Sequence, residues 1–144
     1  MLVSQILKSK ADAHVMTVQP HMTVAEAAAI LSEKRIGTLI VSRDGAHADG
    51  IVSERDIVRE VGKRGAACLA DPVSALMTRD PTTCGRNDTA DQVLQTMTDG
   101  RFRHLPVVEG GTMVGLISIG DVVKARLSEL AMEKTALEGM IMGN

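Results

Sequence analysis

The chain has 144 residues, 44% of them hydrophobic, with a single Phe and no Tyr or Trp. A chain of this length can form one compact domain or two packed half-size units, and its apolar fraction excludes intrinsic disorder. The net charge of −2 and the scarcity of aromatic side chains argue against a nucleic-acid partner, which needs a basic surface or aromatic stacking platforms.

Cysteines, histidines and apolar runs predict no disulfide, metal site, export signal or membrane span. Cys68 and Cys84 are too few for a disulfide framework, so we expect a reducing cytoplasm. The N-terminal stretch is apolar only in short pieces, and no run of eighteen apolar residues occurs, which argues against a signal peptide and against a membrane partner. His14, His21 and His47 show no metal-ligand spacing and are expected at the surface.

The first half of the chain predicts an extended piece, a helix, two strands and a second helix. Apolar residues recur at helical spacing after Thr23, which forms a capping box with Glu26. Short apolar runs bounded by Gly and Asp predict the strands. The ranges are 16–18 for the extended piece, 24–34 for the helix, 38–41 and 50–52 for the strands, and a helix opened by Ser53 and Asp56.

The second half repeats this order. The corresponding ranges are 77–78, 89–98, 105–108 and 115–117, followed by a helix opened by Ser118 and Asp121. Three blocks match between the repeats. Met16-Thr17 and Pro20 correspond to Met77-Thr78 and Pro81, at an offset of 61 residues. Residues 35–41 correspond to 101–107 at an offset of 66, and residues 50–58 correspond to 115–123 at an offset of 65. These offsets predict an insertion of five residues near 82–87 in the second repeat and one extra residue near 46–49 in the first.

Each repeat, at about 55 residues, is too small to bury a sheet alone. We therefore expect an α/β fold of two β-α-β-β-α repeats, packed sheet to sheet about a pseudo-twofold axis with two equivalent clefts between them. The predicted domains are 1–66, the N-terminal segment and first repeat; 67–130, a linker and the second repeat; and 131–144, a helical tail. An amphipathic stretch, 127–141, fits dimerisation, a partner, or packing on its own domain equally well.

The repeated motif Gly-apolar-apolar-Ser-x-x-Asp is the feature that points to function. Ser and Asp at a helix N-terminus are good caps, so a purely structural role stays open for either copy. The same position also offers unpaired N–H groups suited to a phosphate, and the carboxylate can accept both hydroxyls of a ribose. The motif predicts a nucleotide site twice, around Ser53 and Asp56 and around Ser118 and Asp121.

Four features stand out together: the paired repeats, the Met-Thr starts, the His-Leu-Pro-Val-Val segment at 104–108 and the doubled motif. With them the chain resembles a tandem pair of cystathionine-β-synthase (CBS) domains, or Bateman module, over roughly residues 10–130. The resemblance implies that Asp56 and Asp121 bind ribose hydroxyls, that Ser53 and Ser118 lie near ribose or phosphate, and that each nucleotide contacts both repeats. It implies the following partners: Leu76, Met77, Phe102 and Arg103 for Asp56, and Val15, Met16, Ile36 and Gly37 for Asp121.

The two predicted sites are not equal. Family members often carry basic residues before the first strand's Leu; the second repeat has Arg103-His104 there, and the first has Gly37-Thr38. Arg55 lies inside the first motif, where it can meet a phosphate or form a surface ion pair, and Gly120 stands at its place in the second.

The resemblance implies a regulatory sensor that binds an adenine nucleotide, with AMP first and ADP, ATP or NAD as alternatives. With no effector domain in this sequence, such a module would signal in trans to an unknown partner protein, as a homodimer. The competing hypothesis is a structural or dimerisation module with vestigial sites. No nucleophile–base pair or metal-ligand set stands out, so we expect no enzymatic activity.

Overall fold

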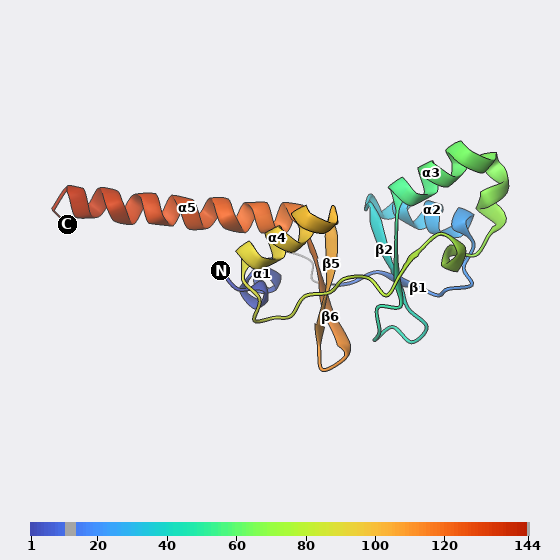
Figure 1. Ribbon diagram of the computed structural model, residues 1–144, viewed down its shortest axis with the longest axis horizontal. Helices are drawn as coiled ribbons and strands as arrows, with labels where there is room; N and C mark the ends of the chain where they lie inside the picture. Colours follow the sequence, from blue (N-terminus) through green and yellow to red (C-terminus); the bar gives the residue numbers. More distant parts are fainter. Residues whose placement is uncertain (11–13, 144) are drawn as a thin grey trace. The chain divides into compact units, whose positions relative to one another are not determined.

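The structure is a computed structural model that describes residues 1–10 and 14–143 (Figure 1). Its helices and strands follow each other in this order: α1 (Val3–Ser9), β1 (Thr17–Val18), α2 (Val24–Lys34), β2 (Thr38–Val41), β3 (Gly50–Ser53), α3 (Glu54–Arg64), two 3₁₀ turns (Gly65–Ala70 and Val73–Ala75), β4 (Thr78–Arg79), α4 (Ala90–Gly100), β5 (His104–Glu109), β6 (Thr112–Ser118) and α5 (Ile119–Ile141). A helix or strand is present at each expected range, and the mixed α/β prediction is confirmed.

The first helix of each repeat begins and ends in the same way. Thr23 and Thr89 accept hydrogen bonds from the backbone N–H groups three residues on, at 3.1 Å in both helices. Arg35 and Arg101 end the helices in the left-handed conformation, with φ of 55° and 57°. Local sequence therefore sets the start of both helices, since hydroxyl caps satisfy N–H groups that have no partner within the helix.

Sheet pairing corrects the alignment of the two repeats. In the first repeat β1 pairs in parallel with β2, with Val18 opposite Val41, and in the second Cys84 forms a parallel bridge to Val107. Both partners are separated by 66, so the offset of 66 already holds at the start of the repeat. The predicted insertion of five residues near 82–87 is therefore wrong.

The Met77-Thr78 segment does not play the part of Met16-Thr17. β4 instead pairs antiparallel with β3, completing a sheet in the order β1-β2-β3-β4, while β5 and β6 form a two-stranded sheet. Met77 lies against Gly50, and the side chain that lies in the same way against Gly115 is Leu7. The true counterpart of Val73–Met77 is thus Val3–Leu7, a match that Val-Ser at 3–4 and 73–74 signals in the sequence.

Packing groups the chain into two compact units that interleave along the sequence. The first-repeat unit holds residues 14–82 and 108–114, and the second-repeat unit holds the described residues of 1–13, 83–107 and 115–144. Residues 108–114, the end of β5, the turn and the start of β6, join the first unit, where the Met113 N–H donates to the Ala46 carbonyl at 2.7 Å. The predicted domains 1–66, 67–130 and 131–144 follow the repeats rather than the packing and stay a prediction.

Helix α1 was not expected from the sequence. Its Val3 and Ile6 are 0% and 2% exposed, and its backbone is held by the second repeat: the N–H of Val3 donates to the Asp88 carbonyl at 2.9 Å. In the first-repeat unit the equivalent segment does the same, because the Val73 N–H donates to Met22 at 2.8 Å. Each repeat is therefore completed by the segment that precedes the other repeat in the chain.

Both cores are aliphatic, as the composition requires. The first-repeat core consists of Val18, Val24, Ala27, Leu31, Leu39, Val41, Val52, Ile57 and Val73. The second-repeat unit buries Met97, Leu105 and Ile117 together with Cys84, where burial, and secondarily Asp88, raises the pKa of the thiol to about 12. Cys68 and Cys84 are both free and buried. No described helix is long and apolar enough to cross a membrane.

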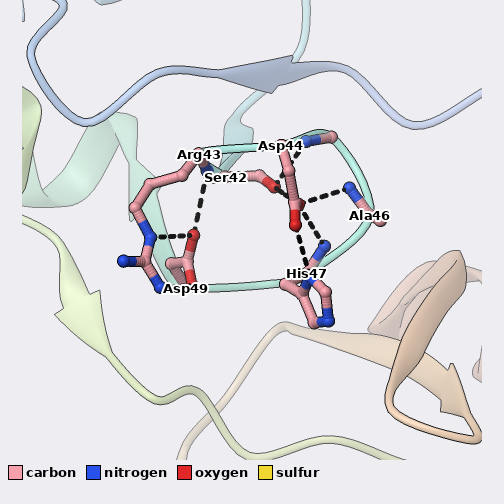
Figure 2. Close-up of polar contacts among 7 residues, drawn as sticks. Ser42, Arg43, Asp44, Ala46, His47 and Asp49 are labelled. Atoms are coloured by element: carbon pink, nitrogen blue, oxygen red, sulfur yellow. Dashed lines mark hydrogen bonds and ion pairs between the residues drawn. The ribbon is translucent and has the colours of Figure 1, made fainter.

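The loop between β2 and β3 is ordered by two carboxylates (Figure 2). Asp44 accepts hydrogen bonds from the N–H groups of Ala46 and His47, at 2.8 and 3.0 Å, and Asp49 accepts from the Arg43 N–H at 2.9 Å. The bond from Ala46, and then that from the His47 ring, holds the pKa of Asp44 well below its usual range. His47 is thus a loop residue, and His14 and His21 are also exposed, as predicted.

Candidate functional site

Ser53 and Asp56 form a reciprocal cap at the start of α3. The Ser53 N–H and hydroxyl both donate to Oδ2 of Asp56, at 2.8 and 3.0 Å, and the Asp56 N–H donates to the Ser53 hydroxyl at 3.3 Å. The other carboxylate oxygen, Oδ1, faces Arg59 at 3.6 Å, and Arg59 is 62% exposed. The capping role considered for this motif is therefore present, and it uses one of the two carboxylate oxygens.

Ser118 and Asp121 repeat this arrangement at the start of α5. The Ser118 N–H donates to Oδ2 of Asp121 at 2.9 Å, and the Asp121 N–H donates to the Ser118 hydroxyl at 3.1 Å. Here a lysine from the N-terminal segment is added: Lys10 Nζ lies 2.9 Å from the same Oδ2 and donates to the Leu116 carbonyl at 2.9 Å. The contacts that the Ser118 N–H and Lys10 make with Asp121 both use Oδ2, so neither of them occupies Oδ1.

The negative charge of the Asp121 carboxylate is stabilised although the side chain is partly buried. Burial raises its pKa, but the Ser118 N–H and the Lys10 ammonium outweigh that effect, so the pKa of Asp121 lies below its usual value. The carboxylate is therefore ionised at neutral pH, which is the form that accepts hydroxyl hydrogen bonds. Lys10 was missed by sequence reasoning because 106 residues separate it from the carbonyl that it contacts.

The residues that precede the first strand of each repeat lie beside these caps. The Gly37 carbonyl accepts from the Glu54 N–H at 2.9 Å, and the Arg103 carbonyl accepts from the Ile119 N–H at 2.8 Å. Thr38 is the register partner of Ser53 in the antiparallel pair β2–β3. The predicted difference in charge between Gly37-Thr38 and Arg103-His104 therefore lies next to the N-termini of α3 and α5.

His104 is half-buried in the second-repeat unit. Burial lowers its pKa, the Asp121 carboxylate opposes that effect, and the Lys10 and Arg103 cations add to it, with a net lowering. The imidazole is consequently neutral at pH 7, able to donate or accept a hydrogen bond. Of the two cations that act on His104, Lys10 also forms an ion pair with Asp121.

The structure places the other predicted residues in their own units. Leu76 and Met77 belong to the first-repeat unit with Asp56, and Met77 lies over Gly50, three residues before Ser53. The ring of Phe102 packs on Gly100 in the second-repeat unit, so closely that a Cβ on that glycine would lie 2.1 Å from the ring. Val15, Met16 and Ile36 belong to the first-repeat unit, while Asp121 belongs to the second, so their predicted grouping stays a prediction.

An open cavity adjoins each cap. One of about 440 Å³ lies over α3 and is lined by Glu54, Arg55, Val58 and Arg59. The other, of about 380 Å³, lies between the N-terminal segment and α5; its polar lining comes from Ser9, Lys10, Asp121, Lys124 and Ser128. The described residues contain no group of three or more His, Cys, Asp or Glu side chains that could hold a metal ion.

The comparisons with known proteins agree with this arrangement. The model of the CBS domain matches twice, at residues 3–63 and 73–128. The chain belongs to the CBS domain family. Both matches begin at the Val-Ser segments, Val3 and Val73, that complete each repeat. The prediction of a tandem CBS pair is confirmed.

Three relatives illustrate the match. A CBS-domain-containing protein of Agrobacterium tumefaciens, ATU1752, superposes with a TM-score of 0.83 and 44% identity, covering 88% of this chain and 99% of its own. The Pyrobaculum aerophilum CBS protein PAE2072, solved in complex with AMP, gives a TM-score of 0.77 and 28% identity, covering 92% and 99%. The Arabidopsis thaliana protein CBSX3, described as mitochondrial, is 32% identical over 98% of this chain and 72% of its own length.

Proposed function

We propose that this CBS pair is a regulatory module that binds adenine nucleotides, with Asp56 and Asp121 each accepting the hydroxyls of a ribose. The observation that carries the proposal is the duplicated cap, in which each Asp uses Oδ2 for its own helix and retains Oδ1 for another donor. A carboxylate at a helix N-terminus, where the helix dipole favours anions, suits a ribose 5′-phosphate. The AMP complex of the Pyrobaculum relative supports this ligand class.

The proposed binding residues are those of the two motifs and their neighbours: Val15, Met16, Ile36, Gly37, Thr38, Ser53, Arg55, Asp56, Leu76, Met77, Phe102, Arg103, His104, Ser118 and Asp121. In the proposed complex each nucleotide contacts both repeats. Its binding free energy then favours one arrangement of the repeats over another, which is how occupancy would reach a partner protein. We propose that the module acts as a cytoplasmic homodimer without catalytic activity.

Isothermal titration with AMP, ADP, ATP and NAD tests the proposal. We expect saturable binding of at least one of them, with AMP first, and recovery of the bound nucleotide intact after long incubation. S-adenosylmethionine serves as a further adenosine ligand that lacks phosphate. Absence of binding with all five at millimolar concentration would leave only a structural module, and steady release of product would reveal an enzyme.

Lys10 gives a prediction specific to the second motif. The lysine holds Asp121 in the absence of a nucleotide, whereas the cation that faces Asp56 is Arg59, whose side chain is exposed. Replacing Lys10 by Met keeps the aliphatic stem and removes the ammonium. Because a partly exposed ion pair contributes roughly 0.2–1 kcal/mol, we expect adenosine to bind the Asp121 site about two- to fivefold more tightly in this variant.

The measurement is best made with Asp56→Asn present, so that the first site binds more weakly and the second site dominates the titration. Adenosine is the probe because it lacks a phosphate that Lys10 could contact. The matched control is Lys124→Met, which removes a cation from the same cavity; in the part of the chain that the structure describes, Lys124 forms no ion pair with Asp121. Unchanged or weaker adenosine binding in Lys10→Met, relative to this control, would show that Lys10 does not compete for Asp121.

A further inference from the structure

Helix α5 continues well beyond the repeat that it closes (Figure 1). Val122 and Ala125, near its start, are 0% and 6% exposed and pack within the second-repeat unit. From Leu130 to Ile141, all side chains are exposed except at Gly139. This final part therefore receives no stabilisation from its own domain, although isolated helices of this length are marginal in water.

The exposed part carries a heptad stripe. Leu127, Leu130, Lys134, Leu137 and Ile141 follow one another at spacings of three and four, which places them at successive a and d positions. The four apolar members are 62%, 49%, 59% and 84% exposed. Counted on the helix, this stripe lies on a different face from Val122 and Ala125. We define these five residues as the α5 stripe.

We propose that the α5 stripe pairs with the α5 stripe of a second copy of this chain, in an antiparallel coiled coil. Lys134 decides the direction. In a parallel pair it would face its own copy across an a layer, with two ammonium groups in contact. In an antiparallel pair each Lys134 faces Leu130 of the other copy, and Leu127 faces Leu137.

The charges that flank the stripe favour the same direction. Parallel helices would place Glu133 of each chain beside Glu138 of the other, which gives two repulsive pairs of carboxylates. Antiparallel helices place Lys124 beside Glu138 of the other copy, twice, and leave a single like pair, Glu133 with its own copy. Lys134 already lies 3.9 Å from Glu138 on its own helix, so its ammonium is directed away while its stem lies along the stripe.

Engineered cysteines test both the pairing and its direction. In the antiparallel pair residues 127 and 137 of different copies are adjacent, whereas the two copies of residue 127 lie about 15 Å apart along the axis. Under mild oxidation the double variant Leu127→Cys/Leu137→Cys should form a covalent dimer whose disulfide joins 127 to 137. Each single variant should stay uncross-linked. Wild type is the background control, because Cys68 and Cys84 are buried.

Every outcome is informative. Self-cross-linking of either single variant, or a disulfide between two copies of residue 127, would overturn the antiparallel arrangement. Failure of the double variant to cross-link, with its circular dichroism unchanged, would overturn the pairing itself. In the double-cysteine background Glu138→Lys should slow cross-linking about fivefold at low salt, and adding Lys124→Glu should restore it. Slowing without restoration would contradict the charge assignment.

Discussion

Replacing Asp121 by Asn is expected to weaken adenine-nucleotide binding at the second motif by about tenfold or more, and Asp56→Asn is expected to do the same at the first. The amide oxygen of Asn can still accept the Ser118 or Ser53 N–H, so the helix cap is retained. The change removes the negative charge that would accept two ribose hydroxyls. Because a hydrogen bond to a charged group contributes about 1.5–3 kcal/mol, the loss of one such bond accounts for at least tenfold in affinity.

Titration calorimetry of the two single variants and the double variant measures this effect. We expect both sites of the double variant to bind at least about tenfold more weakly than those of wild type. The Ala variants provide a contrast: they should lose the same affinity and also about 1 kcal/mol of stability, since Ala cannot cap. Wild-type affinity in all three Asn variants would mean that the two carboxylates serve only as caps.

The second large effect concerns the dependence of the second repeat on α1. Ile6 is 2% exposed within the second-repeat unit, and we expect Ile6→Ala to lower the free energy of unfolding by about 2–5 kcal/mol. The cost combines the lost burial of three methyl or methylene carbons with the cavity that they leave. Urea unfolding followed by circular dichroism measures it.

A matched control separates packing from helix propensity. Met132→Ala also shortens an apolar side chain on a helix, but Met132 is 59% exposed and lies outside the α5 stripe, so its effect should stay within about 0.5 kcal/mol. Equal, small effects of the two substitutions would contradict the assignment of α1 to the second-repeat core.

Sequence reasoning identified the elements whose signals are local. Thr23 and Thr89 begin their helices as predicted because a capping hydroxyl bonds to an N–H only three residues away. The Ser-x-x-Asp motifs were recognised for the same reason, since each spans four residues. The extended segment Met77-Thr78 was recognised as well, but its partner was not, because strand pairing joins residues that are far apart in the chain.

The misalignment of the repeats has a specific physical cause. Met-Thr followed by Pro occurs at both 16–20 and 77–81, but the identity of these residues does not show which strand each segment pairs with. β4 bonds to β3 of the first repeat, while Cys84 occupies the position equivalent to Val18. The Val-Ser match at 3–4 and 73–74 would have revealed the correct correspondence, and with it the buried role of α1.

The sequence alone determined that this chain consists of two α/β repeats, each with a serine and an aspartate at a helix N-terminus, because periodicity, capping and turn chemistry act over a few residues. The tertiary structure decided what surrounds those residues. It brought Lys10 to Asp121, placed Met77 and Leu7 over equivalent glycines, and left the α5 stripe exposed. Such contacts arise from packing between distant segments, which no local pattern specifies.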